Sequence, residues 1–187
     1  MNSDKYNQMI DLINAHGLLL LNSTKEFYNV MDSGGDWFTM IRLIEDRQVY
    51  VSKIYKGKTT YLSKELYYAL RGCKNDHKMM TEHEKRVYDF LSSCTNVDMD
   101  LLKVALNMDR KVLRKTLDTM MKKLLITVLS GGKKITDSWS SYYFGTYEQW
   151  ESSDQSSIYM DEITAREKVN GYLSKIMTDK QIENLLK

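Results

Sequence analysis

The sequence predicts an α+β fold, and three of its properties support that class. The 187 residues are 42% hydrophobic and 28% charged, with a net charge of +2, a balance that allows a buried core and excludes an intrinsically disordered chain. Some segments repeat their apolar residues with the period of a helix, whereas others are runs of β-branched and aromatic residues typical of strands. Proline is absent, which favours helices joined by tight Gly or Asn turns over long proline-rich linkers.

Residues 1–75 predict helices that flank a β-hairpin. A first helix of about three turns ends before Gly17. Val49–Tyr55 and Thr59–Leu62 are expected to pair as strands across the turn Lys56-Gly57. The remaining elements expected here are a buried strand at Leu18–Leu21, an irregular loop at 22–36, a helix at Asp36–Asp46 and a helix capped by Ser63 that ends at Gly72.

Residues 79–150 predict three helices followed by a second hairpin, after a polar boundary at Arg71–Lys78. Thr81 is placed to cap the first of these helices, and the second is expected to bury Leu101, Leu102 and Ala105. The elements expected in order are helices at 81–94, 98–106 and 109–124, a strand at Ile126–Leu129, a turn at Gly131-Gly132 and a strand at Tyr142–Tyr147. This order is that of a winged helix-turn-helix domain.

Residues 158–187 predict a helical tail after an acidic, serine-rich linker at Glu151–Ser157. Two helices are expected, at Met160–Met177 and at Asp179–Leu186, and Thr178 is placed to cap the second. The tail carries too many apolar residues to remain free in solvent, so it should pack on the body of the protein or on a second copy. The sequence therefore leaves open whether the protein forms a homodimer.

Charge is distributed unevenly along the chain. Residues 103–134 contain nine basic residues against the two acidic residues Asp109 and Asp118, whereas residues 135–167 contain seven acidic residues and only Arg166 as a base. The basic set is Lys103, Arg110, Lys111, Arg114, Lys115, Lys122, Lys123, Lys133 and Lys134. Such local asymmetry can form a binding surface for a polyanion in a chain that is nearly neutral as a whole.

Six of these basic residues are the candidates for binding double-stranded DNA. Arg110 with Arg114, and Lys111 with Lys115, form two i, i+4 pairs on the outer side of the third helix of the predicted domain. The N-terminal half of that helix is the part that meets base edges in a helix-turn-helix. Lys133 and Lys134 follow Gly131-Gly132, where a wing would reach the phosphate backbone. The alternative is a solvated basic face on a domain that binds protein.

The sequence predicts no catalytic residue, no metal site and no cofactor. Cys73, His77, His83 and Cys94 match no zinc-ligand spacing. The run Lys56–Thr60 lacks the glycine that a phosphate loop requires five residues before Gly57. No other group of side chains forms a catalytic arrangement.

Three further expectations concern the aromatic residues and the location of the protein. Six aromatic residues of the N-terminal half are expected mainly in the core, and a stacking platform for an unpaired base is the less favoured alternative. They are Trp37, Tyr50, Tyr55, Tyr61, Tyr67 and Tyr68. The absence of a visible membrane span or export signal, with two cysteines read as reduced thiols, predicts a cytoplasmic protein.

Spaced aromatic residues and the order of the elements give the chain a resemblance to a known family. The segments that carry it are Trp37-Phe38 with Ile41, Val49–Lys53, Tyr61–Leu66, Lys85–Leu91 and Tyr143–Trp150. Over most of residues 5–187 the chain resembles short bacterial proteins related to the AlkZ/YcaQ alkylpurine DNA glycosylases. This resemblance implies winged-helix units and association with DNA.

The Gln-x-Gln motif that full-length members of that family use for base excision is absent. The glutamines are Gln8, Gln48, Gln149, Gln155 and Gln181, and no two are separated by one residue. The leading hypothesis is therefore a non-catalytic winged-helix DNA-binding protein, either a regulator or a DNA-repair accessory factor. Two alternatives stay open: a minimal glycosylase in which Glu or Asp activates water, and a protein-interaction module.

Overall fold

The computed structural model describes residues 3–23, 25, 27–73, 80–136, 139–155, 158 and 160–186. His77, most of the predicted boundary at 71–78, and Ser156 and Ser157 of the predicted linker lie outside the described residues. The α+β class is confirmed, since helices combine with two small antiparallel sheets. Among the described residues, no helix has both the length and the apolar character needed to cross a membrane.

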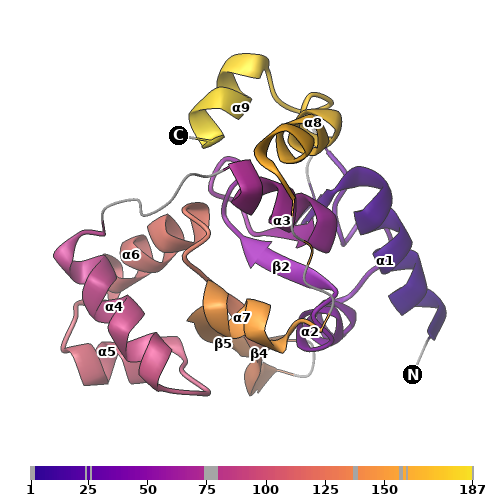
Figure 1. Cartoon of the computed structure of the whole chain (residues 1–187). Coiled ribbons are helices and arrows are strands. Elements are labelled where there is room, and N and C mark those ends of the chain that lie inside the picture. Colours follow the sequence, from indigo (N-terminus) through magenta and orange to yellow (C-terminus); the bar gives the residue numbers. More distant parts are fainter. Residues whose placement is uncertain are drawn as a thin grey trace.

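The chain combines runs of consecutive helices with two β-hairpins (Figure 1). The N-terminal part contains α1 (Ser3–His16), β1 (Leu18–Leu20), α2 (Trp37–Glu45), β2 (Val49–Ser52), β3 (Thr60–Ser63) and α3 (Lys64–Cys73). The central part contains α4 (Glu82–Ser93), α5 (Met99–Leu106), α6 (Arg110–Lys122), β4 (Ile126–Thr136), β5 (Trp139–Thr146) and α7 (Tyr147–Ser153). The C-terminal helices are α8 (Glu162–Leu173) and α9 (Asp179–Leu186).

The N-terminal sheet is buried on both faces. Its three antiparallel strands have the order β1-β3-β2, so the predicted hairpin gains β1 as a third strand. Because successive side chains of a strand point to opposite faces, Tyr50 and Leu62 belong to one apolar cluster, whereas Val51 and Tyr61 belong to the other. Burial on both faces explains why β1 has three consecutive leucines with no polar alternation.

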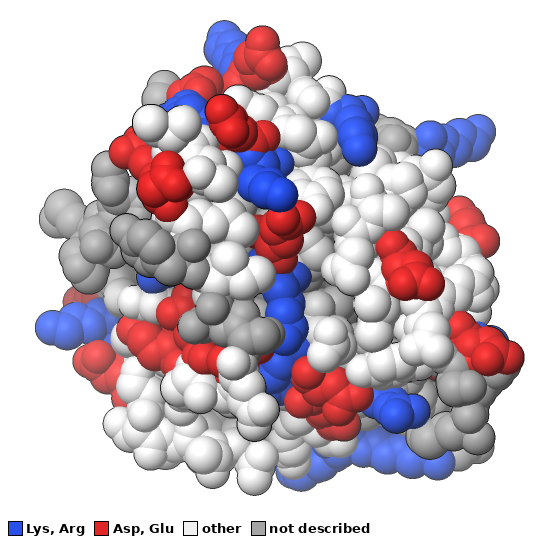
Figure 2. All heavy atoms as spheres, turned by 45° about the vertical axis from the view of Figure 1, so that its right-hand side comes forward, with Lys and Arg blue, Asp and Glu red and all other residues white. Residues whose placement is uncertain are grey.

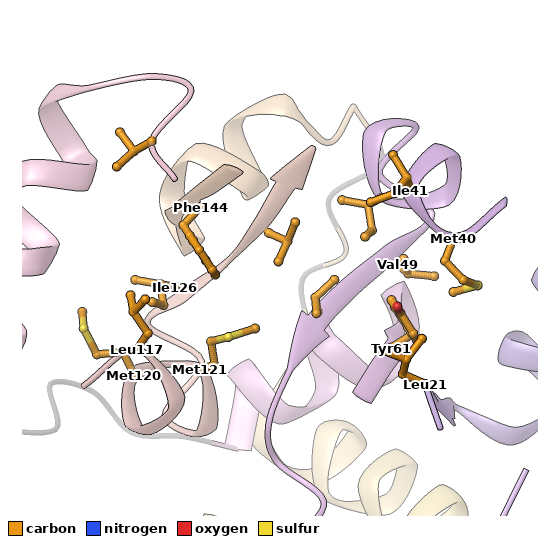
Figure 3. Close-up of a cluster of buried hydrophobic side chains, with 14 of the residues drawn as sticks. Leu21, Met40, Ile41, Val49, Tyr61, Leu117, Met120, Met121, Ile126 and Phe144 are labelled. Carbon is orange, nitrogen blue, oxygen red and sulfur yellow. The ribbon is translucent and has the colours of Figure 1, made fainter. Parts of the chain in front are cut away.

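One apolar cluster joins the N-terminal and central parts. Figure 3 shows Met40 and Ile41 of α2 and Tyr61 of β3 facing the same interior as Leu117 and Met120 of α6. The other cluster covers the second face of the sheet with side chains from α3, α7, α8 and α9.

The edge of the N-terminal sheet meets the β4–β5 hairpin. β2 is an edge strand of this sheet. The side chain of Thr127 on β4 forms hydrogen bonds with its outward-facing backbone groups. The Val51 N–H donates to Thr127 Oγ1 at 3.0 Å, and that hydroxyl donates to the Val51 carbonyl at 2.9 Å. Tyr50 reaches across as well, since its hydroxyl donates to the Leu124 carbonyl at 3.1 Å. The exposed backbone that an edge strand usually presents is thus satisfied by a side chain.

The predicted turn at Gly131-Gly132 is wrong. β4 continues through both glycines to Thr136, and Gly131 pairs with Tyr142 of β5. The glycines serve close packing instead, because a Cβ atom on Gly131 would lie 2.9 Å from Ile41 Cγ2 and one on Gly132 would lie 2.3 Å from Ser141 Oγ. Register shifts accompany them on β4.

Two further expectations need correction, one in the central part and one in the N-terminal part. Leu101 and Ala105 are exposed, whereas α5 buries Leu102 and Leu106. The helix is apolar on two sides, and its spacing alone does not reveal which side meets the core. Likewise the first expected strand of the N-terminal hairpin ends at Ser52 and not at Tyr55.

The predicted linker is wrong for residues 151–154. Thr146 and Gln149 form a capping box that starts α7, and this helix extends to Ser153 because Trp150 is fully buried in the second cluster. Asp154 is also buried, where it accepts hydrogen bonds from Tyr68 Oη at 2.9 Å and from Lys64 Nζ at 2.8 Å.

The C-terminal helices pack on the body of the protein, as the apolar residues of the tail predicted. Ala165, Val169 and Leu173 of α8 are buried against α3, and Ile182 of α9 is buried in the same cluster. Figure 1 shows both helices above α3 and the N-terminal sheet.

Candidate nucleic-acid interface

The start of α6 is set by its local sequence. Asn107 adopts a left-handed conformation that ends α5, and Asp109 then caps α6 by accepting from the N–H groups of Lys111 at 2.8 Å and Val112 at 3.2 Å. Leu113 and Leu117 lie on its inner face and are buried, as the sequence predicted. This packing fixes which side of α6 faces solvent.

The outer face of the N-terminal half of α6 is basic. Arg110, Lys111, Arg114 and Lys115 are all exposed, and none of these side chains has an acidic partner within the described part of the chain. The C-terminal end of the helix differs. There Lys123 binds the buried Glu84 at 2.8 Å, and Asp118 lies 3.8 Å from Lys53.

These cations do not stabilise the helix that carries them. The N-terminus of a helix bears a positive partial charge, so cations there are unfavourable by a few tenths of a kcal/mol or more each. The first turn of α6 contains no acidic residue, and Asp109 at the cap is the only negative group beside it among the described residues. The positive potential of Arg110 and Lys111 in the first turn and that of the helix terminus therefore add, and Arg114 and Lys115 extend the basic face by a further turn.

Lys133 and Lys134 of the hairpin lie near the start of α5, whereas the basic residues of α6 lie near its end. Lys133 Nζ lies 3.8 Å from the carboxylate of Asp98, which caps the start of α5, whereas the basic residues of α6 follow the end of α5. The eight residues of α5 span about 12 Å. Lys134 pairs with Ser140 in the hairpin ladder. The six predicted residues thus form two groups separated by the length of α5.

An aromatic group at the distal end of the hairpin was not predicted. Trp139 stacks on Trp37 of α2 with ring centroids 3.7 Å apart, and Trp37 also contacts Tyr142 at 4.9 Å. Burial raises the pKa of Tyr142 to about 12, so its hydroxyl is neutral at physiological pH. With the hairpin turn placed at Gly131-Gly132, Trp139 lies outside the predicted strands, so its contact with Trp37 could not be predicted.

Two polar side chains of α4 and α7, Glu84 and Gln149, have structural partners. Burial alone would raise the pKa of Glu84, yet the hydrogen bond from Lys123 and the capping contacts with Thr81 hold it below its usual value. The amide of Gln149 caps α7 and donates to the Leu91 carbonyl at 3.0 Å. Both groups hold helices in place.

The face that carries α1 has no single sign of charge. Figure 2 brings this side forward and shows acidic and basic side chains interspersed over it. The unpaired cations of α6 therefore contrast with the pattern on that face.

Comparisons with known proteins give one match. The chain matches the family model described as "AlkZ related" over residues 3–187. A search of the curated proteins and a search of the solved structures each returned no match.

Proposed function

Because the chain belongs to the AlkZ-related family, whose name relates it to DNA-repair glycosylases, we propose that it is a non-catalytic protein that binds double-stranded DNA. Residues 79–150 act as a winged helix-turn-helix unit, with α6 as the recognition helix and the β4–β5 hairpin as the wing. The protein serves as a regulator or as an accessory factor in DNA repair.

The order and pairing of the central elements support this assignment. α4, α5 and α6 precede a two-stranded hairpin. Val97, between α4 and α5, forms an antiparallel bridge with Phe144 of β5, and the Phe144 N–H donates to the Val97 carbonyl at 2.8 Å. The hairpin is thereby attached to the helical unit on the side where a wing lies.

The observation that carries the proposal is the set of four exposed cations at the start of α6. They lie where base edges are read, they have no acidic partners among the described residues, and the helix terminus adds to their potential. Exposed cations that have no acidic partner among the described residues are suited to bind an external polyanion.

Salt-dependent binding to a duplex tests the proposal. The variant R110A/K111A/R114A/K115A should bind far more weakly than the parent chain between about 50 and 200 mM salt, and its salt slope should fall by about 0.9 for each phosphate that it no longer neutralises. The matched control K25A/K58A/K175A/K180A removes the same charge from exposed lysines elsewhere and should bind nearly as well as the parent chain. Equal affinity and equal slope in the α6 variant would disprove the DNA-binding role.

One observation favours a second candidate function, a protein-interaction module. On α5 Leu101 is 43% exposed and Val104 is 78% exposed, and both lie in the helix that precedes α6. Substituting both residues by Gln, which adds no charge, leaves duplex binding intact if α6 contacts DNA. A partner protein captured by the parent chain and lost by this double variant would support the module instead.

Base excision is a separate question with its own assay. A duplex that contains 7-methylguanine should release no base above a buffer control, because the Gln-x-Gln pair is absent. Release that a single acidic substitution abolishes would favour the minimal glycosylase.

A further inference from the structure

The distal end of the β4–β5 hairpin holds a preorganised row of aromatic rings. The ring centroid of Trp37 lies 4.9 Å from that of Tyr142 and 3.7 Å from that of Trp139, with interplanar angles of 31° and 23°. The Trp37 indole N–H donates to the buried Ser140 Oγ at 3.0 Å, which fixes the ring in its plane. Trp37 comes from α2, so the support under Trp139 belongs to a different part of the chain from the hairpin itself.

The outer ring of this row is open to solvent. Trp139 is 42% exposed although one of its faces lies on Trp37, so the other face is available to a ligand. Exposed apolar side chains accompany it along the chain. Ile135 precedes the strand partner of Trp139, and Phe38 follows Trp37 on α2.

A cation lies on the same hairpin. Lys133 is three residues before Thr136, which pairs with Trp139, and this separation is about 10 Å in a strand. The Lys133 side chain is 77% exposed, and its contact with Asp98 at 3.8 Å is longer than a charge-assisted hydrogen bond. It is therefore free to move to a phosphate. An aromatic face with a neighbouring cation is the combination that proteins use for unpaired nucleotides.

We propose that the outer face of Trp139 stacks on an unpaired base of DNA while Lys133 contacts the adjoining phosphate. The proposal rests on the proposed function and names its substrate class, a duplex that contains an unpaired base. In an intact duplex both faces of each internal base are covered by neighbouring pairs, so a ring can stack only on a base that has left the helix. Because Trp37 already holds the Trp139 ring in place, less conformational entropy is lost when a base stacks on Trp139.

Two labelled duplexes test the proposal by anisotropy: one fully paired, and one with the same sequence and a single unpaired thymine. The parent protein should prefer the second by roughly 10-fold, the ratio expected for one base–aromatic stack. Trp139→Ala and Trp139→Leu should both abolish the preference, because neither has a flat ring. Trp139→Phe should keep part of it. Ile163→Ala, at an exposed apolar residue of α8, is the control and should keep all of it.

Tryptophan fluorescence gives an independent reading in the folded protein. The chain has three tryptophans, and Trp150 is fully buried. The unpaired thymine should quench the emission of the parent protein, and Trp139→Phe should remove most of that quenching.

The outcomes separate this proposal from the proposed function. If both duplexes bind equally to the parent protein and the α6 quadruple variant still loses affinity, the stacking site is wrong and duplex binding stands. If Trp139→Leu keeps the 10-fold preference, an apolar contact and not a stacked ring causes it, and the proposal is overturned. If neither the α6 variant nor the Trp139 variants change binding to either duplex, both proposals fail.

Discussion

Replacing Thr127 by Val should destabilise the protein more than any other change of one hydroxyl to a methyl group that we consider. Thr127 is fully buried, and its hydroxyl both accepts from and donates to the backbone of Val51. Valine has nearly the same shape, so the substitution leaves no cavity. It does leave the N–H and the carbonyl of Val51 without partners at the edge of β2.

The magnitude follows from these two orphaned groups. A buried polar group without a partner costs about 1–3 kcal/mol, and the more apolar side chain of Val returns about 1 kcal/mol. The net loss in the free energy of unfolding should be about 1–5 kcal/mol, with a middle value of about 3 kcal/mol. For a chain of this size that is a fall of roughly 10 °C in Tm.

Urea denaturation measures the effect, with Thr116→Val as the matched control. Thr116 is also buried, but its hydroxyl donates at 3.0 Å to the Val112 carbonyl inside α6, where the helix supplies another donor. The control should lose less than about 1 kcal/mol. Equal losses in the two variants, or a loss below about 0.5 kcal/mol in Thr127→Val at an unchanged m-value, would refute the idea that this hydroxyl closes the sheet edge.

Two further predictions concern the pH dependence of stability and one glycine. The folded-state pKa of Glu84 lies below its unfolded value through Lys123, so its contribution is present above pH 4.5 or so and is lost as the pH falls through the folded pKa. Glu84→Gln should therefore be less stable than the parent at pH 6 and equally stable in acid; a deficit that does not change with pH would contradict the ion pair as its cause. Gly17→Ala should lose more than about 1 kcal/mol, because φ is +75° and its Cβ would lie 2.5 Å from Tyr172. In thermal melts Gly34→Ala, with φ +79° but open space around it, should lose less, and the reverse order would show that the clash is unimportant.

Local signals predicted most helix boundaries to within a few residues, although α7 was missed. Thr81 and Glu84 form a complete capping box at the start of α4, and Thr178 accepts from the Gln181 N–H at the start of α9. The outward direction of the basic residues of α6 also follows from local spacing, since burial of Leu113 and Leu117 fixes it. Each of these features depends on residues within two turns of each other.

Features that depend on distant segments were not predictable in this way. The pairing of β1 with β3 joins Leu18 to Leu62, and no local pattern specifies that partner. Gly131 is required by Ile41 of α2, a contact between two parts of the chain, and a glycine pair resembles a turn when that contact is unknown. The aromatic group around Trp139 depends on the same packing of the hairpin on α2. The wrong position of the predicted turn therefore left this group unpredicted.

The two-sided burial of the N-terminal sheet has a consequence for synthesis on the ribosome. Leu18, Tyr50 and Leu62 face a cluster to which α8 and α9 contribute, yet β3 ends at Ser63 and α9 begins at Asp179. At about 5–20 residues per second, the sheet waits on the order of 10 s for its cover. During that interval its apolar face is a target for chaperones, and the N-terminal part should complete its fold only after α8 and α9 have been synthesised.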